Sequence, residues 1–123
     1  MATLIPKLSL VSQDSLTDPL NLETNYRVDN IVDPKEFSKR TIPTASTITL
    51  MPTNSYYSYF YIKVLSGAAK TNYITLTIGS VFTTRVRINE FVLLPLDNNQ
   101  IVKAKSVLGE CKIEYGYWSR ESA

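Results

Sequence analysis

The strongest constraint on this chain is an alternation of apolar and polar residues that begins at Thr44 and continues almost to the C-terminal end. In Tyr73–Ile78, for example, isoleucine or leucine stands at every second position. Such alternation places one face of a β-strand in a core, because successive side chains of a strand point to opposite faces. No stretch has the spacing of an amphipathic helix. The pattern therefore predicts an all-β domain over residues 44–123.

Segments rich in β-branched and aromatic residues are expected to be strands, since short breaks of Asn, Gly, Pro and Ser separate them. They are Ser46–Met51, Tyr56–Leu65, Tyr73–Ile78, Val81–Ile88, Glu90–Leu94, Gln100–Val107 and Glu110–Trp118. Turn signals about every ten residues are typical of an antiparallel β-sandwich or barrel. We expect a jelly-roll-like sandwich, although strand order does not follow from the pattern.

Two of these segments carry more aromatic residues than one thin sandwich needs. Tyr57, Tyr59 and Tyr61 share a face of the second segment, opposite an apolar face that includes Phe60, and Trp118 ends the last segment. Tyrosine and tryptophan combine a large contact area with a polar group, which suits protein interfaces and sugar-stacking platforms alike. Packing within one subunit explains part of this set, and we assign the outward-facing members to contacts between subunits.

Residues 1–43 are predicted to form an extended N-terminal arm. Leu4–Val11 favours one strand, whereas the Pro residues at 19, 34 and 43 are expected to interrupt any regular element beyond it. Asp33 as N-cap and Pro34 at the first helical position favour a short helical turn over Pro34–Lys39. Apolar residues such as Tyr26 and Phe37 predict that the arm packs on its own sandwich or on another subunit.

The chain has no histidine and a single cysteine, Cys111. Ser–His and Cys–His nucleophile pairs, histidine-bearing zinc sites and an intramolecular disulfide are therefore excluded. Because Cys111 lies in an alternating apolar stretch, it is expected to be a buried, inert thiol, with a reactive or intermolecular thiol as the alternative. The first residues lack the pattern of a secretory signal, so the protein is expected to stay where it is made.

Acid–base catalysis by a pair of carboxylates is the one enzymatic mechanism that the composition still allows. The candidate residues are Glu90, Asp97, Glu110 and Glu114. Glu110 and Glu114 would share a strand face with backbones about 13 Å apart, beyond the roughly 5–9.5 Å of glycosidase pairs. No Gly-rich phosphate loop is present, and Asp97–Asn99 is typical of a hairpin turn rather than a calcium site. We expect no enzymatic activity, no cofactor and no bound metal.

The formal net charge of +2 is too small for a dedicated nucleic-acid binder, and we expect no nucleic-acid partner. Residues 1–43 have five basic and six acidic side chains, whereas residues 44–123 have eight and five. Two basic pairs, Arg85 with Arg87 and Lys103 with Lys105, alternate along their segments. Such pairs protect sheet edges, or they contact phosphate or an acidic partner.

The stretch Tyr56–Trp118 resembles small β-sandwich virion proteins of tailed bacteriophages. The resemblance rests on Tyr61-Ile-Lys-Val-Leu-Ser-Gly67, Asn89-Glu-Phe-Val-Leu-Leu-Pro95 and Ile113-Glu-Tyr-Gly-Tyr-Trp118, and it covers about half of the chain. It implies a head-decoration, minor capsid, neck or tail protein, made in the host cytoplasm and built into the virion as a symmetric oligomer. The arm would then reach onto a neighbour or onto the major capsid protein.

The sequence therefore predicts a non-enzymatic virion structural protein. The expected interface residues are Tyr57, Tyr59, Tyr61, Trp118, Arg85, Arg87, Tyr26 and Phe37. A carbohydrate-binding or adhesion module that uses the tyrosine face is the alternative. No membrane partner is expected, because the longest apolar run, Phe91–Leu96, is far shorter than the roughly 20 residues of a membrane helix.

Overall fold

The computed structural model describes residues 2–11, 21–53, 56–80, 82–97 and 99–122, and this part of the chain contains strands and no helix. The strands are β1 (Ala2–Leu4), β2 (Lys7–Val11), β3 (Asn21–Asn25), β4 (Val28–Ile42), β5 (Thr47–Met51), β6 (Tyr56–Gly67), β7 (Tyr73–Ile78), β8 (Phe82–Arg87), β9 (Phe91–Leu96), β10 (Val102–Ser106) and β11 (Cys111–Ser122). Over the same ranges, no helix has the length and apolar character needed to cross a membrane.

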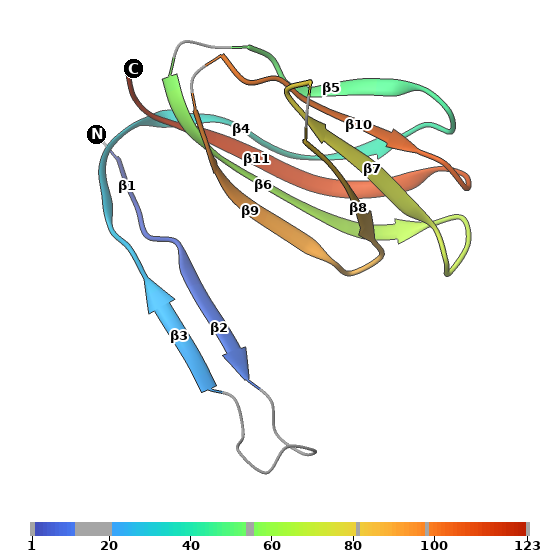
Figure 1. Cartoon of the computed structure of the whole chain (residues 1–123), viewed down its shortest axis with the longest axis horizontal. Coiled ribbons are helices and arrows are strands. Elements are labelled where there is room, and N and C mark those ends of the chain that lie inside the picture. The colour runs from blue at the N-terminus through green and yellow to red at the C-terminus, as the bar shows by residue number, and fades with distance from the viewer. Residues whose placement is uncertain (1, 12–20, 54–55, 81, 98, 123) are drawn as a thin grey trace.

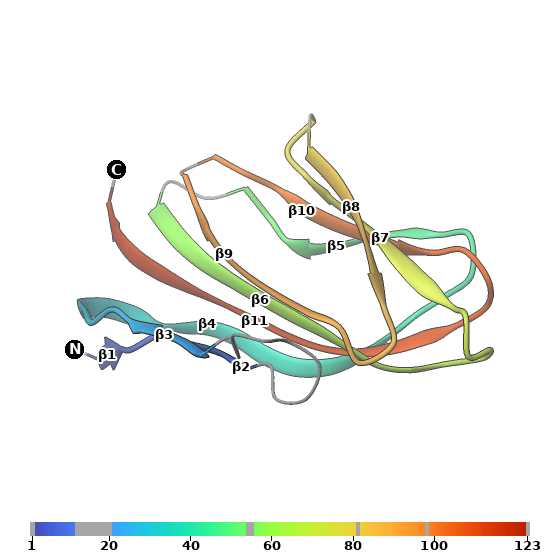
Figure 2. The same cartoon turned by 60° about the horizontal axis from the view of Figure 1, so that its bottom comes forward.

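The body of the molecule is a long antiparallel ribbon that is rolled into two layers. Strands pair in nested fashion, β4 with β11, β5 with β10, β6 with β9 and β7 with β8. Rolling the ribbon also places β11 beside β6 and β10 beside β7. The resulting sheets, β1-β4-β11-β6-β9 and β5-β10-β7-β8, face each other as a sandwich (Figure 2). This nested pairing is that of a jelly roll, so the predicted fold class is confirmed.

The alternating residues fill the space between the two sheets. β7 alternates half-buried and buried positions along its whole length, and Ile74 and Leu76 are fully buried. From the other sheet, Phe60 and Ile62 of β6 are fully buried as well. Cys111 lies in this core as a free thiol, which confirms its predicted burial. Because no disulfide is possible, apolar packing stabilises the sandwich.

Each predicted strand segment from Ser46 onward corresponds to an observed strand, from β5 to β11. Val81, the predicted start of one segment, lies outside the described residues. Pro95, expected to end its strand, lies inside β9 instead. β9 is at the edge of the five-stranded sheet and pairs only with β6, and an edge strand tolerates proline because one side of its backbone needs no partner.

The predicted helical turn at Pro34–Lys39 is wrong, because these residues belong to the long strand β4. Pro34 lies opposite Trp118, where the register between β4 and β11 shifts. Proline has no backbone N–H to donate, and a register shift at its position means that the neighbouring strand does not need that hydrogen bond. Residues 28–42, expected in the arm, are therefore part of the sheet, and the segment that leaves the sandwich is confined to residues before β4.

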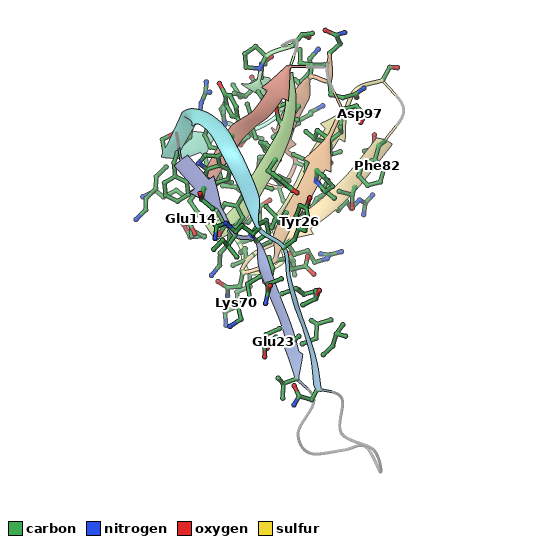
Figure 3. The ribbon with its side chains drawn as sticks, turned by 90° about the vertical axis from the view of Figure 1, so that its left-hand side faces the viewer. Glu23, Tyr26, Lys70, Phe82, Asp97 and Glu114 are labelled. Atoms are coloured by element: carbon green, nitrogen blue, oxygen red, sulfur yellow. The ribbon has the colours of Figure 1, made fainter. Side chains whose placement is uncertain are left out.

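β2 and β3 form a separate two-stranded hairpin that projects from the sandwich (Figure 1). The one strand expected over Leu4–Val11 is divided, since β1 ends at Leu4 and joins the sheet through β4. At the base of the hairpin, the Tyr26 backbone N–H donates to the Pro6 carbonyl oxygen at 3.1 Å. Figure 3 shows Tyr26 at this junction and Glu23 farther out along the hairpin.

The side chain of Asn72 connects the loop after β6 to the turn before β11 through hydrogen bonds. Its Nδ2 donates to the carbonyl oxygens of Gly109 at 3.1 Å and Glu110 at 3.2 Å. Its Oδ1 accepts from the backbone N–H groups of Tyr73 at 2.8 Å and Leu108 at 3.3 Å. The side chain is fully buried, and these contacts use the whole hydrogen-bonding capacity of its amide.

Candidate interaction surfaces

The outer face of the five-stranded sheet carries a continuous group of large apolar side chains, which we call the aromatic face. Its members are Phe37 of β4, Tyr61 of β6, Phe91 and Leu93 of β9, and Trp118 of β11. The strand register sets Phe37, Gly116, Tyr61 and Leu93 in one row across four neighbouring strands. Paired residues share a face of a sheet, so this row projects away from the core.

Gly116 makes room for aromatic contacts at the centre of this face. β4 and β6 flank β11, which puts their backbones about 9.6 Å apart at about 4.8 Å per strand. The ring centroids of Phe37 and Tyr61 are nevertheless only 6.4 Å apart, and those of Phe37 and Trp118 are 6.2 Å apart. The rings therefore lean together above Gly116, where glycine presents no side chain.

The aromatic face is largely open to solvent. Phe37 is 60 % exposed, Phe91 62 % and Leu93 40 %, which is unusual for side chains that prefer burial. Contiguous apolar surface of this kind typically marks an interaction site. Tyr59 differs from its neighbours, because it is only 8 % exposed and presents little ring surface to a ligand. Tyr57 lies in β6, but its side chain is outside the described part of the chain.

The aromatic face also contains a partly buried polar contact. The Tyr61 hydroxyl donates a hydrogen bond to Oε1 of Glu114 at 2.9 Å. Burial raises the pKa of Tyr61 to about 12, and the hydrogen bond and negative charge of Glu114 add to the rise. Tyr61 is therefore a neutral donor at physiological pH, and its ring orientation is fixed by both Phe37 and Glu114.

The outer face of the four-stranded sheet has the opposite character, and we call it the basic face. Arg85 and Arg87 of β8 and Lys103 and Lys105 of β10 lie on it, with β7 between the two strands. The guanidinium groups of Arg85 and Arg87 lie 4.8 Å and 5.5 Å from the centroid of the Tyr73 ring. This contact holds both arginines over one ring, so the two predicted basic pairs share one face.

The projecting hairpin supplies a third surface, the hairpin face. Every residue of β2 and β3 is exposed. The register places Leu8 and Leu10 beside Leu22 on one side, whereas Lys7 and Glu23 form an ion pair of 3.0 Å on the other. Tyr26, 66 % exposed, continues the apolar side toward the sandwich. An isolated two-stranded hairpin is marginally stable in water, so packing of this apolar side against another surface would stabilise it.

The candidate carboxylates do not converge. Glu114 contacts Tyr61, and Glu90 accepts from the Arg87 backbone N–H at 2.8 Å in the turn after β8. Among the residues that the structure describes, no group of three or more acidic, cysteine or histidine side chains is arranged to hold a metal ion. Asn99 has a left-handed φ of 62°, which suits a turn. The predicted hairpin turn at Asp97–Asn99 is wrong, however, because this segment joins β9 of one sheet to β10 of the other.

Sequence reasoning missed Phe91 and Leu93 of the aromatic face and the leucines of the hairpin face. The segment Phe91–Leu96 is apolar at nearly every position, so its sequence does not reveal which residues point outward. Leu8, Leu10 and Leu22 alternate with polar residues as core strands do. The signal that identifies them is the pairing of β2 with β3 alone, which only the structure provides.

No protein-family model matches this chain, and no curated protein matches it significantly. Among solved structures, the cupin domain of Schizosaccharomyces pombe Cnp3 is similar over 94 % of this chain and 84 % of its own. The sequence identity is 11 % and the TM-score is 0.44.

Proposed function

We propose that this protein is a non-enzymatic structural component of a virion, a capsid-decoration or minor capsid protein that stabilises a phage particle as a homo-oligomer. The observation that carries the proposal is the presence of two large exposed apolar surfaces, the aromatic face and the hairpin face, on one small chain. The bacteriophage-like sequence of Tyr56–Trp118 supports the assignment to a virion.

A second copy of the chain is the occupant that these surfaces favour. The hairpin extends away from its own sandwich (Figure 1), and Leu8, Leu10 and Leu22 on its apolar side are exposed. Contact between the hairpin face of one subunit and the aromatic face of the next joins two different surfaces head to tail. Such a contact forms a closed ring if the rotation between neighbouring subunits divides a full turn evenly.

Binding to particles tests the virion assignment. Purified protein is added to phage particles of the same genome that were assembled without it, and co-sedimentation is measured. We expect saturable binding that Phe91→Ser weakens about tenfold or more, because a buried phenylalanine contributes about 1.5–3 kcal/mol.

Phe82→Ser is the matched control, since Phe82 is 51 % exposed and belongs to the other sheet. It is expected to bind particles as the unmodified protein does. Failure to co-sediment, together with absence of the chain from purified wild-type particles by mass spectrometry, would rule out the virion role.

The alternative, a carbohydrate-binding module, gains less support. Tyr59 is buried, and Tyr61 is stacked against Phe37 and hydrogen-bonded to Glu114, so neither ring offers the open flat surface that stacks on a sugar. A glycan array distinguishes the two functions. Specific glycan binding that is lost in Trp118→Ala would favour the carbohydrate-binding module.

A further inference from the structure

The net charge of the chain is small, but basic residues are concentrated on the outer face of the four-stranded sheet. The outward positions of β5, β10, β7 and β8 are occupied only by basic, threonine and tyrosine residues, without a carboxylate or an aliphatic side chain among them. They are Thr47, Thr49, Lys103, Lys105, Tyr73, Thr75, Thr77, Thr83, Arg85 and Arg87. The basic face therefore has four positive charges within a chain whose net charge is +2.

These charges form a regular array. Within each strand the two basic residues are two positions apart, or about 7 Å, and β8 and β10 are separated by β7, or about 10 Å. Arg85 and Arg87 are exposed and held over Tyr73, so less side-chain freedom is lost when they bind a ligand. Thr75 lies between Arg85 and Lys105 in the register, and its hydroxyl is a further donor.

We propose that the basic face binds the phosphate backbone of a nucleic-acid duplex without reading its sequence. Arginine forks, lysines and threonine hydroxyls are the groups that contact phosphate oxygens in protein–DNA complexes. The face is the outer side of a four-stranded sheet, and its described residues include no helix that would enter a groove to contact base edges. This proposal goes beyond the structural role above and does not depend on it.

Two observations favour a duplex over other polyanions. The Tyr73 ring lies under two guanidinium groups and is not free to stack on an unpaired base, which single-strand binding requires. The face also lacks the apolar centre that characterises protein interfaces, which disfavours an acidic protein partner. The expectation of no nucleic-acid partner rests on the small net charge, and it leaves edge protection and contact with phosphate or an acidic partner open for the two basic pairs. Because both pairs lie on one face, the proposal adopts the phosphate contact.

The test is fluorescence anisotropy of a labelled DNA duplex of arbitrary sequence, titrated with the full chain between about 50 and 200 mM salt. We expect a dissociation constant of about 10⁻⁴–10⁻⁶ M and a slope of log K against log salt of about −3.6 per subunit, for four phosphate contacts. The double variant Arg85→Gln/Arg87→Gln should reduce the magnitude of that slope by about 2. If this variant does not fold, Lys103→Gln/Lys105→Gln provides the same test.

The matched control is Lys39→Gln/Lys63→Gln, which removes the same charge from the outer side of the five-stranded sheet. Its salt slope should equal that of the unmodified chain. An equal loss in the control pair would overturn the proposal, and so would no anisotropy change at the lowest salt. Tighter binding of the unpaired single strand, or competition by polyglutamate as effective as by duplex DNA, would contradict the duplex assignment.

Discussion

At the scale of single residues, Asn72 shows how one side chain fixes the end of the sandwich. It is fully buried and joins two segments that are far apart in the sequence. The same region leaves no room for larger groups, because a Cβ added to Gly109 would lie 2.8 Å from the Cβ of Ala68 at a φ of 112°. The loop after β6 and the turn before β11 therefore depend on each other.

We predict that Asn72→Ala lowers the free energy of unfolding by about 2–3 kcal/mol, because it leaves buried backbone groups without partners. Thr71→Ala is the matched control, since Thr71 is exposed next to it, and should change stability by less than about 0.5 kcal/mol. Urea unfolding followed by tryptophan fluorescence measures both. Equal stability of the two variants would mean that the Asn72 hydrogen bonds do not hold this end of the sandwich.

Tyr61 provides a prediction about pH. Its pKa of about 12 exceeds the ordinary value of 10.0, so the folded state holds the phenolic proton more tightly than the unfolded chain. The stabilisation from this proton is fully present below pH 10 and is lost as pH rises through about 12. In an ultraviolet titration we expect a rise in phenolate absorbance near pH 12. The Tyr61→Phe variant should lack this rise.

Glu114→Gln should move this step to lower pH while leaving it above the ordinary value, since burial is the largest cause of the shift and Glu114 adds to it. A titration curve that is identical in the unmodified protein and in Tyr61→Phe over this range would contradict the assignment.

At the scale of elements, the sequence is most informative where local signals agree. Alternation and turn residues locate β5 to β11, because both are properties of neighbouring residues. β4 is different, since its path through Pro34 depends on pairing with β11, more than 70 positions away along the chain. The nested strand order and the row from Phe37 to Leu93 likewise depend on register between distant segments, which composition does not encode.

The hairpin of β2 and β3 carries the prediction that belongs to this scale. In dilute solution its backbone amides should exchange with solvent much faster than those of β6 and β11, because every residue of β2 and β3 is exposed. At concentrations where subunits associate, exchange in β2 and β3 should slow while exchange in the sandwich core stays the same. Hydrogen-exchange mass spectrometry at two protein concentrations measures this. Equal protection of the hairpin at both concentrations would argue against its role in assembly.

At the scale of the whole molecule, one core separates two surfaces of different chemistry. The aromatic face lies on one outer side of the sandwich and the basic face on the other, and the hairpin extends from the end where β1 and β4 meet (Figures 1 and 2). The two faces follow from the alternation itself, because a strand of the sandwich points one set of side chains into the core and the other set outward. An assembly through the first face and the hairpin would leave the basic face open.

The mass of the protein in solution tests this account most directly. Sedimentation equilibrium over a range of concentrations should give a defined multiple of 13.9 kDa. Leu10→Asn should raise the dissociation constant of the oligomer by about tenfold or more for each contact that contains Leu10. Val11→Asn, which alters an exposed residue on the opposite side of β2, should leave it unchanged. A mass of 13.9 kDa for the unmodified protein at every concentration would contradict self-assembly through the hairpin.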